Sequence, residues 1–121
     1  LRVSRKEEMS ESLFASGMPF KGRPDQETTM AEIERVASVS SGVRRFGSAA
    51  LDLAYVAAGR YDGCWERGLS AWDVAAGALI ANEASARVSD LKGGDKIVSD
   101  RSIIAAGPMI YDQLFKLVTN R

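Results

Sequence analysis

A helix that the sequence predicts to be almost wholly apolar carries a carboxylate on its first turn. Asp73 lies on the first turn of a helix expected over residues 70–84, almost all of whose other residues are apolar. A charge there needs a partner, which the helix N-terminus, a hydrogen-bond donor or a metal ion can supply. Spacing alone favours a structural role, because Ser70 and Asp73 resemble a capping box with Asp in place of Glu. The alternative is that Asp73 is an oxygen ligand for a hard cation such as Mg²⁺.

A second carboxylate, Glu66, precedes Asp73 by seven residues. It ends a predicted strand over residues 61–66, and a short turn over residues 67–70 leads into the apolar helix. Both carboxylates are therefore expected near the carboxyl edge of the sheet, where open α/β sheets bind ligands. The alternative is a solvated Glu66 paired with Arg67.

Small residues follow the preceding predicted strand. Gly47, Ser48 and Ala49 lie between a strand and a helix N-terminus, where free backbone N–H groups can hold an anion or a substrate oxygen. Without further context, a tight turn with Ser48 as the N-cap is the more common explanation. Arg44 and Arg45 just before them fit phosphate binding or a subunit contact, although a solvated surface is the more frequent role.

Composition limits the chemistry that this chain can perform. The 121 residues suffice for one domain, and 16 basic residues balance 16 acidic residues, which argues against bulk binding of nucleic acid or an anionic membrane. The absence of His excludes a His-based triad or a His-ligated zinc within the chain. Cys64 is the only cysteine and no apolar run approaches the ~20 residues of a membrane span, so we expect a cytoplasmic protein.

The elements that must position these residues alternate between helix and strand. This order predicts an α/β layer structure with a largely parallel sheet. Two of the helices are apolar on nearly every face and are expected to lie buried between layers. Helices are predicted over residues 26–39, 49–58, 70–84 and 108–118, strands over 43–46, 61–66 and 103–106, and a short hairpin from 87–89 and 96–98.

Three blocks, in this order, resemble the inositol monophosphatase family. They are GVRRFGSAALDLAYVAAG at residues 42–59, YDGCWE at 61–66 followed by WDVAAG at 72–77, and IIAAGP at 103–108. The Trp-Asp-x-Ala-Ala-Gly block is the specific one, and the others support it by order and spacing. The similarity is clear over residues 42–117.

The resemblance implies a layered α-β-α-β-α fold and a Mg²⁺-dependent phosphomonoesterase that forms homodimers. By motif, Asp73 would be a catalytic residue that ligates Mg²⁺ and approaches a substrate hydroxyl, and Glu66 would hydrogen-bond a ring hydroxyl. Gly47, Ser48 and Ala49 would line the substrate pocket through their backbone. Metal ions in such a site polarise the phosphoryl oxygens and lower the pKa of the attacking water.

The chain departs from the family pattern in what it lacks. The family's other metal motif, Asp-Pro-x-Asp-Gly-Thr, is absent, as is its upstream glutamate, and the chain opens on Leu1 rather than Met. We therefore expect residues 1–121 to be the C-terminal α/β domain of a longer enzyme whose N-terminal half carries those ligands. One carboxylate does not build a multi-metal site, so the chain alone is predicted to be inactive.

Other functions on the same fold stay open at the level of sequence. Family relatives act on 3′-phosphoadenosine phosphates, fructose bisphosphate or histidinol phosphate, although Glu66 favours a phosphorylated polyol, most simply inositol monophosphate. A different class of function is a protein-binding module that acts through its dimer surface, since some members are thought to bind the transcription machinery. Direct binding of nucleic acid or of a membrane is not expected.

Overall fold

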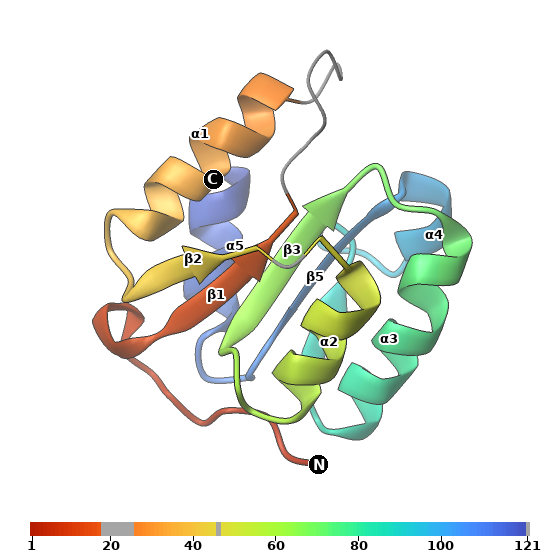
Figure 1. The fold of residues 1–121 in the computed structure, drawn as a ribbon, viewed down its shortest axis with the longest axis horizontal. Helices are drawn as coiled ribbons and strands as arrows, with labels where there is room; N and C mark the ends of the chain where they lie inside the picture. The colour runs from red at the N-terminus through yellow and green to blue at the C-terminus, as the bar shows by residue number, and fades with distance from the viewer. Residues whose placement is uncertain (18–25, 46, 121) are drawn as a thin grey trace.

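The strands form one five-stranded sheet with helices on both faces (Figure 1). The computed structural model describes residues 1–17, 26–45 and 47–120, without the side chain of Asp73. Across the sheet the order is β2-β1-β3-β5-β4. The strands are β1 (Leu13–Ser16), β2 (Gly42–Arg44), β3 (Gly63–Arg67), β4 (Arg87–Ser89) and β5 (Ser102–Ala106), and a 3₁₀ turn, η1 (Met9–Glu11), precedes β1.

The sheet is mixed because of a single strand. Strand β1 pairs in parallel with β2 and β3, whereas β5 pairs antiparallel with both β3 and β4. Of the strands that the structure describes, four therefore run in one direction and β5 runs against them. The predicted α/β layer architecture is confirmed, and the predicted predominance of one strand direction holds for every strand except β5.

Five α-helices cover the two faces of the sheet in the part of the chain that the structure describes. They are α1 (Gln26–Ala37), α2 (Ala49–Ala57), α3 (Ala71–Glu83), α4 (Ile97–Asp100) and α5 (Tyr111–Thr119). Alternation along β1 and β3 sends Phe14 and Trp65 into the core beneath α1 and α5, and sends Ala15 and Cys64 into the core beneath α2 and α3. The result is a three-layer α/β/α unit.

The predicted hairpin over residues 87–89 and 96–98 is wrong. Residues 87–89 form β4, but they pair with β5, and residues 97–100 form the short helix α4. The cause is Asp90, whose carboxylate accepts hydrogen bonds from the backbone N–H groups of Lys92 (2.8 Å), Gly94 (2.9 Å) and Lys96 (2.9 Å). These bonds wind the connection into a closed loop that delivers the chain to a helix rather than to a second strand.

Helices α2 and α3 approach each other closely at Gly77. A Cβ atom added there would lie 2.5 Å from Cδ1 and 2.9 Å from Cβ of Leu53, so only glycine fits. Glycine costs a helix about 1 kcal/mol relative to alanine, and close packing is the compensation.

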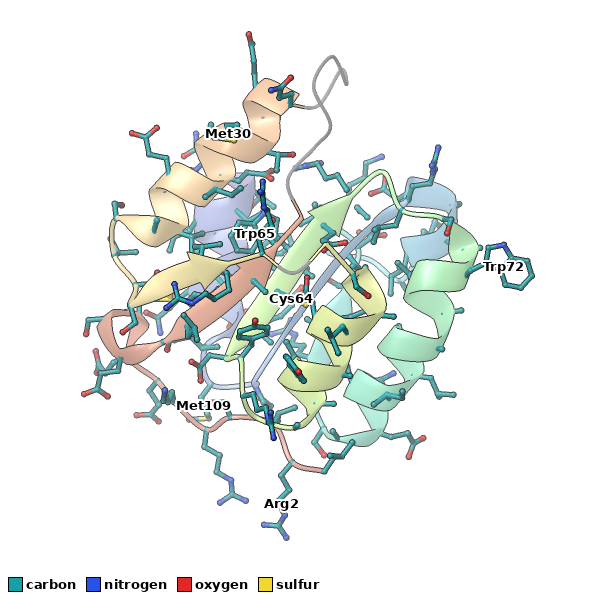
Figure 2. All side chains as sticks on the ribbon, in the orientation of Figure 1. Arg2, Met30, Cys64, Trp65, Trp72 and Met109 are labelled. Carbon is teal, nitrogen blue, oxygen red and sulfur yellow. The ribbon has the colours of Figure 1, made fainter. Side chains whose placement is uncertain are left out.

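The outer face of α3 is open in this structure, contrary to the prediction that the helix lies buried between layers. Trp72 is 89% exposed, Leu79 62% and Ile80 39%, and Ala75 and Ala76 between them are also exposed. Figure 2 shows the Trp72 ring pointing away from the body of the molecule. These five residues, at helical spacing, form what we call the α3 stripe.

Candidate functional site

The residues singled out from the sequence gather at the carboxyl ends of three neighbouring strands. Strand β1 lies between β2 and β3, with Ala15 opposite Arg44 and Ser16 opposite Trp65. The turn to α2 follows β2, and the turn to α3 follows β3, so both helices begin at the same edge of the sheet. This edge is the place where α/β sheets of this kind bind ligands.

The turn after β2 is closed by Ser48. Its hydroxyl accepts a hydrogen bond from the backbone N–H of Leu51 at 3.3 Å, which makes Ser48 the N-cap of α2, as the structural alternative predicted. Gly47 has φ +81°, a backbone conformation that favours glycine, and a Cβ there would have open space around it. Gly47 and Ser48 are exposed and Ala49 is buried, so the start of α2 borders solvent.

Glu66 is buried at the end of β3, with 8% of its surface exposed. A Cβ added to Gly17 would lie 3.0 Å from both Cδ and Oε1 of Glu66, so the chain after β1 packs directly on the carboxyl group. The alternative prediction of a solvated Glu66 is wrong, because Glu66 is buried. Arg67, the partner which that alternative gave it, forms an ion pair with Glu32.

A second buried carboxylate, Glu32 of α1, holds both chain neighbours of Glu66. Glu32 is fully buried and accepts hydrogen bonds from Nε1 of Trp65 at 3.2 Å and from Nε of Arg67 at 3.1 Å. Nη2 of Arg67 adds a second contact at 2.5 Å to the same oxygen. Helix α1 therefore fixes the strand on either side of Glu66.

A third buried carboxylate, Asp52, lies on the first turn of α2 and contacts the carboxyl group of Glu66. Burial raises the pKa of Asp52, and the contact with Glu66 opposes that rise. Nearby, burial raises the pKa of the Cys64 thiol well above its usual range, and the charges of Asp52 and Glu66 add to the effect. The thiol is therefore neutral and inert at physiological pH.

Asp73 lies on the first turn of α3, and its side chain is outside what the structure describes. Ser70 occupies the N-cap position in an extended conformation, but its side chain makes no capping hydrogen bond. The turn before the helix is held by Arg101, whose guanidinium donates to the carbonyl oxygens of Leu69 (3.0 Å) and Gly68 (3.3 Å). The turn into α3 is thus held by Arg101, and the predicted side-chain cap by Ser70 is not formed.

The described side chains contain no group of three or more Cys, Asp or Glu residues arranged to hold a metal ion. Within that part of the chain, the residues do not amount to a complete Mg²⁺ site. A resident metal would need oxygen ligands from outside these described side chains.

Three residues that support this edge were not predicted as part of the site: Glu32, Asp52 and Arg101. Asp52 had a visible signal, because it is a lone charge within an apolar helix. Glu32 and Arg101 had none, since each looks like an ordinary surface charge until the fold places it.

Comparison with known proteins identifies the family of this chain. The model of the inositol monophosphatase family matches residues 1–121. The chain belongs to the inositol monophosphatase family.

Relatives within the inositol monophosphatase family share both sequence and fold with the chain. An inositol-1-monophosphatase of Mesorhizobium japonicum is 48% identical over 118 residues, covering 98% of this chain and 44% of the relative. A Nus factor SuhB of Pasteurella multocida is 39% identical over 98% of this chain and 44% of that protein. The crystal structure of the extragenic suppressor protein suhB from Bartonella henselae superposes with a TM-score of 0.92 at 44% identity, over 97% of this chain and 45% of that one.

The chain thus spans less than half the length of these inositol monophosphatase relatives. The predicted membership and fold are confirmed. In the described part of the chain, none of the helices combines the length and the apolar character that crossing a membrane requires.

Proposed function

We propose that this chain is the C-terminal part of a Mg²⁺-dependent phosphomonoesterase whose substrate is an inositol monophosphate. The observation that carries the proposal is Glu66, a buried carboxyl group at the carboxyl edge of the sheet in a chain that matches the inositol monophosphatase family throughout. A carboxylate beside a helix N-terminus suits a polyol phosphate. The carboxylate can accept a hydrogen bond from a ring hydroxyl, while the backbone N–H groups of the helix face an anionic oxygen.

In this proposal each residue of the edge has its own role. Glu66 accepts a hydrogen bond from a ring hydroxyl and so selects a polyol. The backbone of Gly47, Ser48 and Ala49 lines the substrate pocket at the start of α2. Asp73 supplies one oxygen ligand to Mg²⁺, and a bound Mg²⁺ would stabilise charge on the phosphoryl oxygens.

The α3 stripe supports the proposal that a further half completes the enzyme. An apolar helix face with a tryptophan that is 89% exposed is costly in water and typical of a surface that another part covers. The relatives are more than twice as long as the matched segment, which leaves room for such a half. We propose that the N-terminal half covers the stripe and brings the remaining metal ligands, so that residues 1–121 alone are inactive.

The test is phosphate release from myo-inositol 1-phosphate, with and without Mg²⁺, by this chain and by the full-length protein that contains it. Release by the full-length protein only, abolished by Asp73→Asn, is the expected result. Exposed Asp95→Asn, on the loop before α4, is the matched control and should leave the rate unchanged. A panel with 3′-phosphoadenosine phosphate, fructose bisphosphate and histidinol phosphate separates the enzyme alternatives. Full hydrolysis by Asp73→Asn would overturn the assignment of the metal ligand.

A second candidate function is a protein-binding module on the same fold. The observation that favours it is that several relatives are named as Nus factors, among them that of Pasteurella multocida. The Asp73→Asn variant of the full-length protein separates the two, because a binding role does not need the metal ligand and would survive the substitution.

We further propose that the full-length protein is a cytoplasmic homodimer. Sedimentation of the full-length protein at several concentrations tests the dimer, and a monomer at all of them would contradict it.

A further inference from the structure

Asp52 is a buried acid without a hydrogen-bond donor. It is 1% exposed, and among the described residues no N–H or O–H group donates to either carboxylate oxygen. An ionised carboxylate in such a place is costly, and native proteins leave few buried polar atoms unpaired. Asp90 shows the contrast in the same chain, because it is equally buried but accepts three backbone hydrogen bonds. The cost of burying Asp52 must therefore be offset in some way other than by backbone hydrogen bonds.

That compensation is available from Glu66. The side chain that Asp52 contacts is the carboxyl group of Glu66, which itself is only 8% exposed. Two carboxyl groups in contact away from water do not both ionise cheaply, and a single proton between them removes the repulsion and makes one hydrogen bond. Two other ionisable groups among the described residues interact with the pair, the Cys64 thiol and the Tyr61 hydroxyl. Burial raises the pKa of both, so neither of these two supplies a compensating charge.

The surroundings of Glu66 make such a bond directional. Gly17 closes the space on one side of the Glu66 carboxyl group. A Cβ atom added to Gly17 would lie 3.0 Å from Cδ and Oε1 of Glu66. Trp65 and Arg67 on either side are tied to Glu32, so the backbone of Glu66 has no freedom to turn. The orientation of the carboxyl group also depends on the side-chain torsions of Glu66, on which a hydrogen bond from Asp52 of α2 would act.

We propose that Asp52 is a positioning residue that shares one proton with Glu66 and so fixes the orientation of the Glu66 carboxyl group at the sheet edge. The effect of Asp52 on catalysis rests on the proposed function, in which Glu66 accepts a hydrogen bond from a ring hydroxyl of the substrate. The effect of Asp52 on the Glu66 carboxyl group does not rest on that function, because the proton is shared in the absence of substrate.

The first test is carried out on this chain, by ¹³C NMR with labelled Asp and Glu carboxyl groups. Glu66→Gln and Asp52→Asn assign the two signals. We expect the two signals to titrate as a coupled pair, each with a step at the midpoint of the other, and Asp52→Asn to leave Glu66 with a single step. Independent single-step curves for the two groups would overturn the proposal, whatever the activity of the protein.

The second test separates positioning from mere support of the fold, in the full-length enzyme. Asp52→Leu is expected to raise KM for myo-inositol 1-phosphate about tenfold, with a nearly unchanged rate on p-nitrophenyl phosphate, which has no ring hydroxyl for Glu66. Asp52→Asn keeps a hydrogen-bonding partner of the same shape and should restore KM to within about threefold of the wild-type value. An equal loss on both substrates, or no rescue by Asn, would contradict the positioning role.

The two tests also distinguish failure of this proposal from failure of the proposed function. If the wild-type protein hydrolyses neither substrate, the phosphatase proposal fails, and the NMR titration alone decides on the pair. If Asp52→Leu does not fold, the NMR titration of Asp52→Asn still tests the shared proton. A two-step curve for Glu66 that is unchanged in Asp52→Asn would overturn the proposal that the two groups share a proton.

Discussion

Glu32 on α1 and Arg67 at the end of β3 form a partly buried ion pair that joins a helix to the strand beside the proposed site. Nε and Nη2 of Arg67 both donate to Oε2 of Glu32, at 3.1 and 2.5 Å. Arg67 is partly exposed, whereas the side chain of Glu32 is 1% exposed. Removing Arg67 should therefore cost more stability than removing Glu32, because loss of Arg67 leaves the buried charge of Glu32 without its partner, whereas loss of Glu32 leaves a partly exposed charge.

Arg67→Leu is expected to destabilise the protein by about 3 kcal/mol, the lower end of the range for breaking a buried pair, since Arg67 itself is partly exposed. Urea unfolding of the two proteins measures the difference. Asp112→Ala is the matched control, because it removes an exposed pair with Arg87 and should cost no more than about 1 kcal/mol. Equal effects of the two substitutions would show that burial of Glu32 carries no energetic weight.

Gly77→Ala is expected to destabilise the protein by about 1–3 kcal/mol, although alanine is the better helix former. The added Cβ would lie 2.5 Å from Cδ1 of Leu53, and the overlap forces α2 and α3 apart. Thermal unfolding gives the sign directly. Exposed Ala76→Gly, on the same helix, isolates the effect of helix propensity and should cost about 1 kcal/mol. A gain of stability in Gly77→Ala would refute the close approach of the two helices.

Asp90 is expected to make the protein sensitive to acid. Desolvation raises the pKa of Asp90, but three backbone N–H groups outweigh it and hold the pKa below the ordinary value of 3.8. Because the folded-state pKa is lowered, the contribution to stability is complete above the unfolded-state pKa and is lost as pH falls through the folded-state pKa.

Asp90→Asn should therefore cost about 1–3 kcal/mol at pH 7, as expected for loss of buried hydrogen bonds, and progressively less below pH 3.8. Denaturant unfolding at a series of pH values compares the two proteins. Exposed Asp95→Asn on the same loop should show no such trend. A difference between wild type and Asp90→Asn that stays constant down to pH 2 would disprove the assigned protonation.

Leu79→Glu tests what covers the α3 stripe. In residues 1–121 alone, the substitution places a charge on an exposed face, so it should reduce self-association and dye binding without loss of fold. In the full-length protein the same charge would be buried and should destabilise the fold or prevent the halves from joining. Light scattering and thermal unfolding measure the two effects, and a neutral result in the full-length protein would contradict a covered stripe.

Local pattern predicted most of the helices and strands because each carries its own signal. The alternation before Glu66 marks β3, the apolar run at residues 103–106 marks β5, and Ser48 marks the start of α2. The failed hairpin shows the limit of this approach. A turn rich in glycine is typical of a hairpin, but the bonds of Asp90 to Lys92, Gly94 and Lys96 decided the path of the chain.

The site was only partly predictable for a related reason. Glu66 and Ser48 lie at ends of elements, where position along the chain already indicates position on the sheet edge. Glu32 contacts Trp65 and Arg67 across more than thirty residues, and that contact depends on how α1 crosses the sheet. Periodicity places a residue on a face of a helix, but it does not say which strand the face meets. The role of Asp73 as a metal ligand stays a prediction.

The one reversed strand has a consequence for biosynthesis. Among the described strands, β4 pairs with β5 only, and β5 connects it to β3 and the rest of the sheet. A ribosome makes residues 87–89 before residues 102–106, so β4 leaves it without a neighbour to bind. Strand β4 can therefore join the sheet only once β5 has been made, because β5 lies between β3 and β4. A nascent chain that ends before residue 102 has no β5 to cover β3, and an uncovered strand edge is the type of surface that pairs with other chains.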